Sequence, residues 1–228
     1  MKGKVVLVTG ASGGLGTYVT QAFLDAGATV IGTSRKIRQT DFVSTEFTAL
    51  SGEISSEAGA IALVETITAR FGRLDVLAHT VGGFAGGQSV ADIDDATFQR
   101  MFDLNVSSFF HILRATIPML RQSGSGRIVA IGSRAAVEPG PGVGAYSASK
   151  AAMVSLVKTV ATENRDAAVT ANVILPGTMD TPANRMAMPH ADFSKWVQPA
   201  SVASLAVWLA SDSAKDLTDA TIPVYGNA

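Results

Sequence analysis

Short apolar runs alternate along the chain with longer segments of helical periodicity. Residues 4–9 (KVVLVT) are apolar and β-branched with little alternation, which is typical of a strand buried on both faces. Residues 14–26 then place Leu15, Val19 and Phe23 on one helical face. Further strands are expected at residues 29–33, 47–50, 76–79, 127–131, 170–175 and 221–225, and further helices at residues 56–71, 97–120, 145–162 and 201–210.

The alternation of strands with helices predicts an α/β fold on a parallel sheet of about seven strands. Right-handed crossovers place helices on both faces of such a doubly wound sheet. Pro223 in the last strand has no N–H to donate, so this strand is expected at the sheet edge. The irregular segment between Gly177 and Pro199 is long for a connection, and we expect a substrate lid at about residues 178–199.

Composition bounds the class of protein. The chain has 228 residues, 47% hydrophobic and 16% charged, so residues 1–228 are expected to form a single α/β domain. A formal net charge of −1 offers no basic excess for nucleic acid or an anionic membrane, and neither is expected as a partner. There is no cysteine, and the separated His79, His111 and His190 predict no metal site. No signal peptide or membrane-spanning run is recognised, so a cytoplasmic protein is expected.

Residues 9–16 (TGASGGLG) form a glycine-rich loop between the first strand and the first helix. Glycines there let the backbone approach a pyrophosphate, and the helix N-terminus presents unpaired N–H groups to it. A bare tight turn is the alternative, but a strand before the loop and a helix after it are the context that dinucleotide binding requires. The loop therefore predicts a Rossmann-like domain. Its candidate cofactor contacts are Gly10, Ser12, Gly13, Gly14, Leu15 and Gly16.

The residues after the second strand bear on the choice of cofactor. A carboxylate here binds the ribose 2′-OH and repels a 2′-phosphate, but this chain has Ser34, Arg35 and Lys36. Arginine grips a phosphate with a bidentate fork. The segment therefore favours NADP(H), with Ser34 and Arg35 as contacts. Use of NAD(H) stays open. The other alternative is that Arg35, Lys36 and Arg38 form a basic turn that is exposed to solvent and contacts no cofactor.

A serine, a tyrosine and a lysine form the candidate catalytic set. Tyr146 and Lys150 lie at i and i+4, on one face of a predicted helix. An ammonium about 4 Å from a phenolate contributes roughly 4 kcal/mol at an effective dielectric of about 20, so Lys150 is expected to lower the pKa of Tyr146. Ser133 follows a strand at the edge where parallel sheets bind ligands. We expect Ser133 to hold a substrate oxygen that Tyr146 protonates. The alternative is a tyrosine that merely starts a helix, with an exposed lysine one turn later.

These motifs together resemble the short-chain dehydrogenase/reductase family over nearly the whole chain. Asn105 in DLNVSS matches the asparagine that completes the family's proton relay through a bound water. Pro176 and Gly177, with Thr181, match its nicotinamide-side motif. The resemblance implies that Lys150 also holds the nicotinamide ribose and that the segment after Gly177 is a substrate lid.

Two segments depart from the usual family pattern. His79-Thr80-Val81-Gly82 stands where many members have Asn-Asn-Ala-Gly, and Glu53 stands where an aspartate meets the adenine. The further cofactor contacts that the resemblance implies are Glu53, Ile54, Thr80, Val81, Gly82, Tyr146, Lys150, Pro176, Gly177, Met179 and Thr181.

A narrower resemblance concerns the expected pocket. Residues 81–87 (VGGFAGG) and 179–185 (MDTPANR) are similar to segments of dihydropteridine reductases. Those enzymes have an alanine where Ser133 stands and an aspartate where Ser34 stands, so the catalytic residues favour ordinary carbonyls instead. Candidate walls of an apolar pocket are Phe84, Met179, Met186, Met188 and Trp196. The lack of clustered charge near the lid argues against a highly anionic substrate, although Arg134 and Arg185 could still contact one.

The main interpretation is an NADP(H)-preferring short-chain oxidoreductase that transfers a hydride between a nicotinamide cofactor and a small carbonyl or alcohol substrate. One alternative is a quinonoid dihydropteridine reductase. An alternative from another class is a non-catalytic NADPH-binding sensor, although such a sensor has no need of Ser133, Tyr146 and Lys150. The family resemblance implies a homodimer or homotetramer that assembles through the helices at residues 97–120 and 145–162.

Overall fold

The computed structural model describes residues 1–227 and is built on a seven-stranded parallel sheet. The strand order is β3-β2-β1-β4-β5-β6-β7, so the chain changes direction across the sheet between β1 and β4. The strands are β1 Val5–Thr9, β2 Thr29–Ser34, β3 Phe47–Ser51, β4 Val76–His79, β5 Arg127–Ile131, β6 Thr170–Pro176 and β7 Thr221–Val224. The sheet confirms the predicted doubly wound fold, and β7 with Pro223 lies at its edge as expected.

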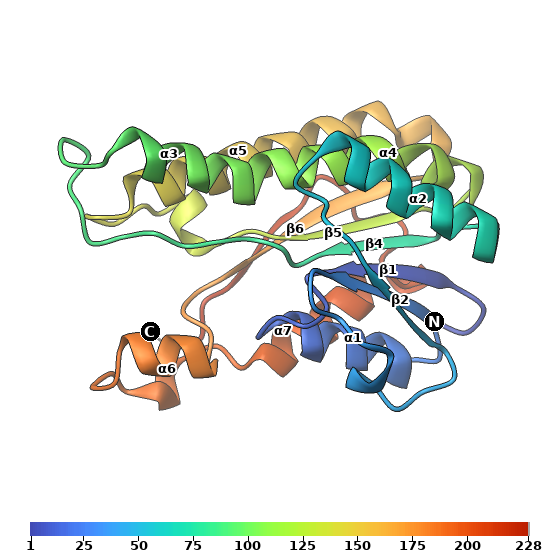
Figure 1. The fold of residues 1–228 in the computed structure, drawn as a ribbon, viewed down its shortest axis with the longest axis horizontal. Helices are drawn as coiled ribbons and strands as arrows, with labels where there is room; N and C mark the ends of the chain where they lie inside the picture. The colour runs from blue at the N-terminus through green and yellow to red at the C-terminus, as the bar shows by residue number, and fades with distance from the viewer. Residues whose placement is uncertain (228) are drawn as a thin grey trace.

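Helices cover both faces of the sheet. Figure 1 shows α2, α3, α4 and α5 on one side and α1 and α7 on the other. The helices are α1 Gly16–Asp25, α2 Glu57–Phe71, α3 Asp95–Phe102, α4 Ser108–Gln122, α5 Gly144–Glu163, α6 Pro182–Ala187 and α7 Pro199–Leu209. Short 3₁₀ turns lie at Gln39–Asp41, Arg134–Ala136, Arg165–Ala167, Phe193–Lys195 and Asp212–Ala214.

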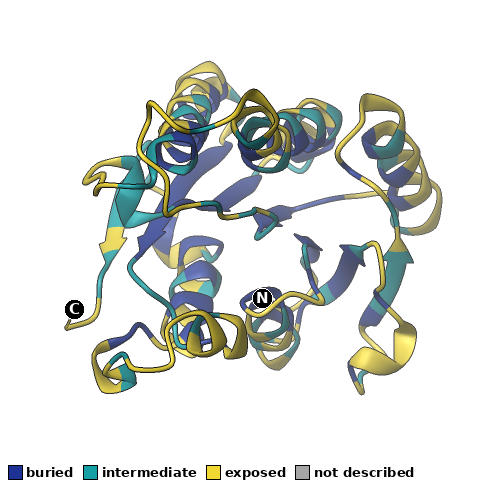
Figure 2. Ribbon diagram, turned by 60° about the vertical axis from the view of Figure 1, so that its left-hand side comes forward, coloured by how far each residue is buried: buried dark blue, intermediate teal, exposed yellow. Residues whose placement is uncertain are grey.

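The two-residue period of the strands divides the core into two halves. Leu7 of β1 points to the side of α2, α4 and α5, where it joins Ile67 and Phe109. Its neighbours Val6 and Val8 point to the opposite side and pack with residues of α1 and α7. Figure 2 accordingly shows buried central strands, and helices that are buried toward the sheet and exposed outward. This two-sided burial explains why the strands read as continuous apolar runs.

The helix expected at residues 97–120 is three segments. A π-helical turn at Asp103–Ser107 separates α3 from α4 and carries the buried Asn105. A single π turn inside an α-helix often marks a functional site, because the widened turn redirects side chains. Apolar periodicity does not reveal which carbonyl each N–H selects, so the sequence could not predict this break.

The segment at residues 178–199 is more ordered than its sequence suggested. It contains α6, and the Thr181 hydroxyl caps this helix by accepting a hydrogen bond from the Asn184 N–H at 3.3 Å. Met179 and Val197 form a parallel bridge that ties the two ends of the segment together. The segment packs against the glycine loop, because a β-carbon at Gly14 would lie 3.4 Å from the Thr181 methyl group.

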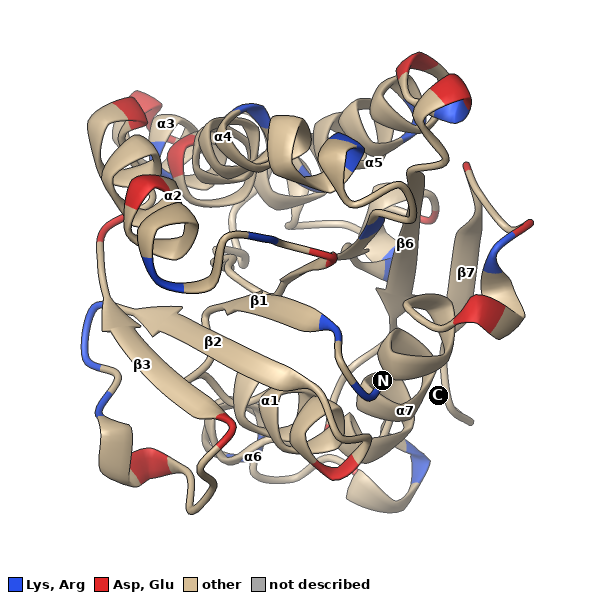
Figure 3. Ribbon diagram, turned by 90° about the vertical axis from the view of Figure 1, so that its right-hand side faces the viewer, with Lys and Arg blue, Asp and Glu red and all other residues tan. Residues whose placement is uncertain are grey.

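Charged residues of both signs are distributed over the two helix layers (Figure 3). Among residues 1–227, no helix is long and apolar enough to cross a membrane. Within the same range, no three His, Asp or Glu side chains are grouped so that they could hold a metal ion.

Candidate functional site

The glycine loop makes a tight backbone cradle at the end of β1. Gly10 has a φ of 74°, a value that side chains disfavour, and the Gly13 N–H donates to its carbonyl at 2.8 Å. A β-carbon at Gly16 would lie 1.9 Å from the Gly10 oxygen, so only glycine fits there. Leu15, at the N-cap of α1, offers no side-chain acceptor to the first turn. In that turn the Thr17 N–H donates to the Gly13 carbonyl at 3.1 Å, so the uncapped helix start would receive an anion through its other N–H groups.

The basic side chains of the turn after β2 differ in whether they form ion pairs with other residues. The Ser34 and Ser12 hydroxyls are hydrogen-bonded at 2.7 Å, which joins this turn to the glycine loop. Arg38 is bound to Asp41 through a 3.2 Å ion pair. Arg35 and Lys36 are exposed and form no ion pair with another described residue. The structure thus leaves the two cations nearest to Ser34 accessible.

Thr80 and His79 connect β4 to β1 below the cradle. The Thr80 hydroxyl donates to the Thr9 carbonyl at 2.7 Å, so it bridges the two strands. His79 is fully buried, its Nδ1 lies 2.9 Å from the Thr9 hydroxyl, and its ring lies 4.7 Å from that of Phe109. Burial, together with the nearby Lys150 ammonium, lowers the pKa of His79 to about 3. His79 is therefore a neutral part of the core.

The structure brings Ser133 and Tyr146 into contact. Ser133 directly follows Ile131-Gly132 at the end of β5, and Tyr146 lies in the first turn of α5. Burial raises the pKa of Tyr146, and its hydrogen bond with the Ser133 side chain lowers it to a smaller extent. The prediction that the pKa of Tyr146 is lowered is therefore wrong for this structure, because desolvation of the phenolate outweighs the hydrogen bond with Ser133.

Lys150 lies one turn after Tyr146, with its ammonium inside the protein. Its Nζ donates to the Ile131 carbonyl at 3.0 Å. Burial lowers the pKa of Lys150 to about 8. A β-carbon at Gly82 would lie 3.0 Å from this Nζ, so the backbone after β4 passes directly beside the ammonium. The i, i+4 spacing placed Tyr146 and Lys150 on one helix face correctly, but it carried no information about this desolvation.

Asn105 joins three parts of the site through its side-chain amide. Its Oδ1 accepts from the Gly83 N–H at 2.9 Å, and its Nδ2 donates to the Gly83 carbonyl at 3.1 Å. The same Nδ2 donates to the Ser149 hydroxyl at 3.0 Å, and that hydroxyl donates to the Tyr146 carbonyl at 2.7 Å. The buried amide therefore fixes the backbone after β4 relative to the first turns of α5.

A cleft of about 700 Å³ opens where β1, β4, β5, β6 and β7 end. This is the edge at which open parallel sheets bind ligands, beside the change of direction between β1 and β4. Its lining includes most of the predicted catalytic residues and several of the predicted cofactor contacts. These are Leu15, Thr80, Gly82, Ser133, Tyr146, Lys150, Pro176, Gly177 and Met179.

The other predicted contacts lie outside the lining of this cleft. Glu53 is exposed, and its carboxylate accepts a hydrogen bond from the Ser55 N–H at 3.2 Å. Ile54 is buried in the core beside α2, and Val81 packs on the same core. Thr181 is buried at the start of α6. The cofactor roles assigned to these residues stay predictions.

The pocket walls were predicted only in part. Phe84, Met179 and Met188 line the cleft, and the Phe84 ring lies edge-on to Tyr146 at 5.0 Å. Met186 is 80% exposed and Trp196 is buried, and neither lines the cleft. Sequence reasoning missed further lining residues, because they come from separate turns that periodicity does not relate. They include Ala135, Glu138, Val143 and Tyr225, whereas Gly83, Asn184 and Ala187 lie in segments that the sequence had already assigned to the pocket or the lid.

Comparison with known proteins agrees with this geometry. The sequence model of the short chain dehydrogenases matches residues 4–191. The 7alpha-hydroxysteroid dehydrogenase of Escherichia coli K12 is 29% identical, over 99% of this chain and 94% of that protein. The rhamnolipid-biosynthesis 3-oxoacyl-acyl-carrier-protein reductase of Pseudomonas aeruginosa is 30% identical, over 99% of this chain and 96% of its own length.

A solved structure extends the similarity to the fold. The 3-ketoacyl-acyl-carrier-protein reductase of Brucella melitensis, complexed with NADH, superposes with a TM-score of 0.88 and 27% identity. The superposition covers 99% of this chain and 98% of that one. None of these three proteins is a dihydropteridine reductase, so that narrower likeness stays a prediction. The chain belongs to the short-chain dehydrogenase family of oxidoreductases.

Proposed function

We propose that this oxidoreductase reduces a small carbonyl compound with NADP(H), and that Tyr146 donates the proton. One observation carries the proposal: Tyr146 and Ser133 are hydrogen-bonded in a cleft that also contains Leu15 of the glycine loop. The cradle at Gly10 and Gly16 and the uncapped start of α1 fit a dinucleotide pyrophosphate. The bound nicotinamide supplies the hydride.

Each catalytic side chain has a separate task in this proposal. The Ser133 hydroxyl holds the substrate oxygen, and Tyr146 protonates that oxygen as negative charge develops on it. The raised pKa of Tyr146 keeps the phenol protonated before reaction, which suits the reductive direction. Lys150, fixed on the Ile131 carbonyl, is placed to hold the nicotinamide ribose and to stabilise the phenolate that forms. Asn105 positions Gly83 and α5, and it is assigned to the support of the proton relay.

The preference for NADP(H) rests on the turn after β2. Arg35 and Lys36 are accessible beside Ser34, whereas the neighbouring Arg38 is engaged with Asp41. An Arg35→Ala variant is expected to lose about tenfold in NADPH affinity, since a charge-assisted contact to phosphate is lost, with little change for NADH. Arg38→Ala is the matched control, which should change neither affinity. Equal NADPH binding by the Arg35 variant and the wild type would refute this assignment.

The remaining assignments concern the lid and assembly. Residues 178–199 are proposed as the substrate lid, because Met179, Asn184, Ala187 and Met188 line the cleft. The whole chain is proposed to act as a single catalytic domain. A homodimer or homotetramer through α4 and α5 is proposed from the family, and light scattering of the purified protein at several concentrations tests it.

Cofactor oxidation by the purified protein tests the proposed reaction. Ketones and aldehydes are offered with NADPH or NADH, beside a quinonoid dihydropterin, to the wild type and to Tyr146→Phe. Carbonyl turnover that falls by about a thousandfold in Tyr146→Phe supports the proposal, a loss within the range of removing a positioned acid. Turnover of the pterin alone would favour the dihydropteridine reductase alternative. NADPH binding with no turnover would favour the sensor.

A further inference from the structure

We propose that Arg134 receives a carboxylate on the substrate, so that the substrates of this enzyme are carbonyl compounds with an apolar body and an anionic group. The inference rests on the proposed carbonyl reduction, because that reaction requires the substrate carbonyl at Ser133, next to Arg134. Arg134 follows Ser133 in the chain and opens the 3₁₀ turn Arg134–Ala136. Ser133, Arg134 and Ala135 all line the cleft. A group bound at Arg134 therefore shares the cleft with a carbonyl bound at Ser133.

Among the described residues, Glu138 and Tyr225 contact the Arg134 guanidinium. Its Nε donates to a Glu138 carboxylate oxygen at 2.8 Å, and its central carbon lies 4.8 Å from the centre of the Tyr225 ring. Tyr225 follows β7 and is held close to the end of β6, since a β-carbon at Gly177 would lie 2.8 Å from the Tyr225 carbonyl. The guanidinium therefore stacks on the Tyr225 ring, a contact that does not require Glu138.

The Glu138 contact is of a kind that a ligand can replace. The side chains of Arg134 and Glu138 are 42% and 51% exposed, and exposed ion pairs contribute little to stability. A substrate carboxylate inside the cleft accepts two parallel hydrogen bonds from the guanidinium fork in a less hydrated setting. Glu138 is then released toward solvent, while the Tyr225 ring keeps the guanidinium in place.

Other cations are less suited to this role. Among the described residues that line the cleft, Lys150 is the other side chain with a positive charge, and it is bound to the Ile131 carbonyl. Arg185, the second arginine that the sequence suggested, does not line the cleft. It forms two hydrogen bonds to Asp180, at 2.5 and 2.8 Å, and lies over the Phe193 ring. The two candidate arginines are distinguished by their place, because Arg134 lines the cleft and Arg185 does not.

The rest of the cleft defines the uncharged part of the substrate. Phe84, Val143, Met179 and Met188 present apolar surface to it. Methionine side chains adapt to ligands of irregular shape, so the walls suit an aromatic or branched aliphatic body. The substrate class is therefore an oxo acid or an aldehyde acid with an apolar body.

Calorimetric titration of the protein loaded with oxidised cofactor tests the inference without any turnover. The two probes are 4-formylbenzoate and its uncharged methyl ester. The wild type is expected to bind the acid at least about tenfold tighter than the ester, which corresponds to one charge-assisted contact. Arg134→Met should remove that difference, Arg134→Lys should keep part of it, and Glu138→Gln should tighten binding of the acid. Equal affinity for acid and ester in the wild type overturns the inference, as does failure of the acid to bind.

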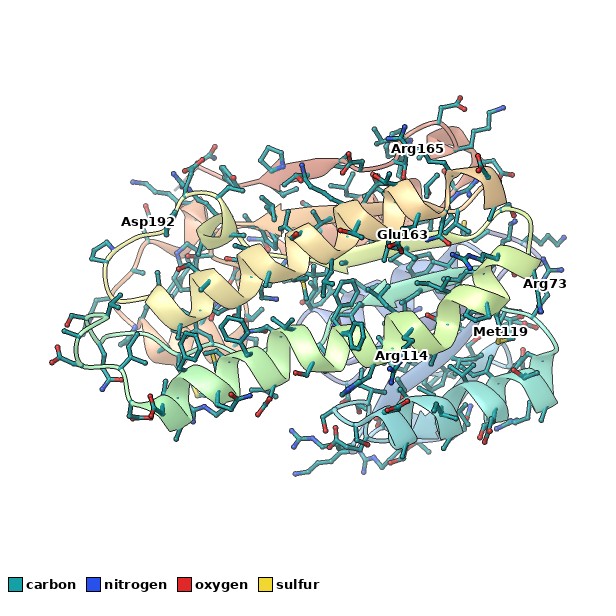
Figure 4. The ribbon with its side chains drawn as sticks, turned by 90° about the horizontal axis from the view of Figure 1, so that it is seen from above. Arg73, Arg114, Met119, Glu163, Arg165 and Asp192 are labelled. Carbon is teal, nitrogen blue, oxygen red and sulfur yellow. The ribbon has the colours of Figure 1, made fainter. Side chains whose placement is uncertain are left out.

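Arg114 provides a matched control. It pairs with Glu57 at 2.6 Å and lies 5.2 Å from the Phe110 ring, but it projects from α4 on the outer helix layer (Figure 4). Arg114→Met removes the same charge and the same kinds of contact, and should leave the preference for the acid intact. A loss of preference in this variant would mean that net charge, not Arg134, is responsible.

Turnover of the same probes with NADPH separates the inference from the proposed function. Binding of the acid through Arg134 without reduction of either probe would leave the anion site standing and remove the proposed reaction. Reduction of both probes at equal efficiency, unchanged in Arg134→Met, would leave the reaction standing and remove the anion site. Thermal unfolding of each variant verifies that it is folded.

Discussion

Replacement of Asn105 by leucine tests the link between the fold and the site. The Asn105 side chain is fully buried and makes three hydrogen bonds, two to the Gly83 backbone and one to Ser149. Leucine has a similar size but no polar atom. The partly buried Gly83 N–H and carbonyl would then lack their side-chain partner. The Ser149 hydroxyl would keep its bond to the Tyr146 carbonyl.

The expected loss of stability follows from those two backbone groups. A fully buried donor or acceptor left without a partner costs about 1–3 kcal/mol, but the Gly83 groups are only partly buried and water in the cleft can reach them. We therefore expect the unfolding free energy of Asn105→Leu to be lower by about 2 kcal/mol, after the added apolar surface offsets part of the cost. Activity should also fall at temperatures where the variant is folded, because Asn105 no longer fixes Gly83 and the adjoining Gly82 beside Lys150.

Urea denaturation followed by tryptophan fluorescence measures the first effect, and carbonyl reduction measures the second. Asn172→Leu is the matched control, since Asn172 is equally buried and its amide also bonds two backbone groups, those of Leu217 and Ala220. It should lose comparable stability but retain activity while folded. A change below about 1 kcal/mol in Asn105→Leu, or equal loss of activity in both variants, would refute the reasoning.

Three further predictions concern the backbone and charges around the cleft. Because burial lowers the pKa of Lys150 to about 8, kcat/KM for NADPH should fall above about pH 8 as the ammonium is lost. The unfolded chain binds this proton up to about pH 10, so the unfolding free energy should rise between about pH 8 and 10 in the wild type but not in Lys150→Met. Gly82→Ala places a β-carbon 2.8 Å from Asn105 Oδ1 and 3.0 Å from Lys150 Nζ, and steady-state kinetics should show at least about a tenfold loss of kcat. Thr80→Val removes the bond to the Thr9 carbonyl below the cradle, and titration should show about tenfold weaker NADPH binding; unchanged affinity would assign Thr80 to the core alone.

The strands and most helices were predictable because their burial requires apolar residues at regular positions in the sequence. Strands such as β1 and β5 are buried on both faces and therefore read as unbroken apolar runs. The π turn at Asp103–Ser107 was not predictable, since it changes hydrogen-bond partners without changing the apolar pattern. The six-residue helix α6 is too short for periodicity to appear, although Thr181 and Pro182 are typical of a helix start.

The candidate site was predictable where chemistry depends on local spacing. The glycine loop and the Tyr146–Lys150 pair each lie within one stretch of chain, and Leu15 of the loop lines the same cleft as Tyr146 and Lys150. The pKa of Tyr146 was not predictable, because it depends on burial by several elements. The same reason applies to Arg134 with Tyr225, which come from the ends of β5 and β7 and meet only in the folded chain.

Transfer of deuterium to a carbonyl substrate from NADPH with deuterium at both C4 positions tests the central claim most directly. Mass spectrometry of the alcohol product reports whether the hydride moves directly between nicotinamide and substrate. Our account predicts deuterium on the former carbonyl carbon with the wild type, and almost no product with Tyr146→Phe. Product without deuterium, or undiminished labelled product from Tyr146→Phe, would contradict the account.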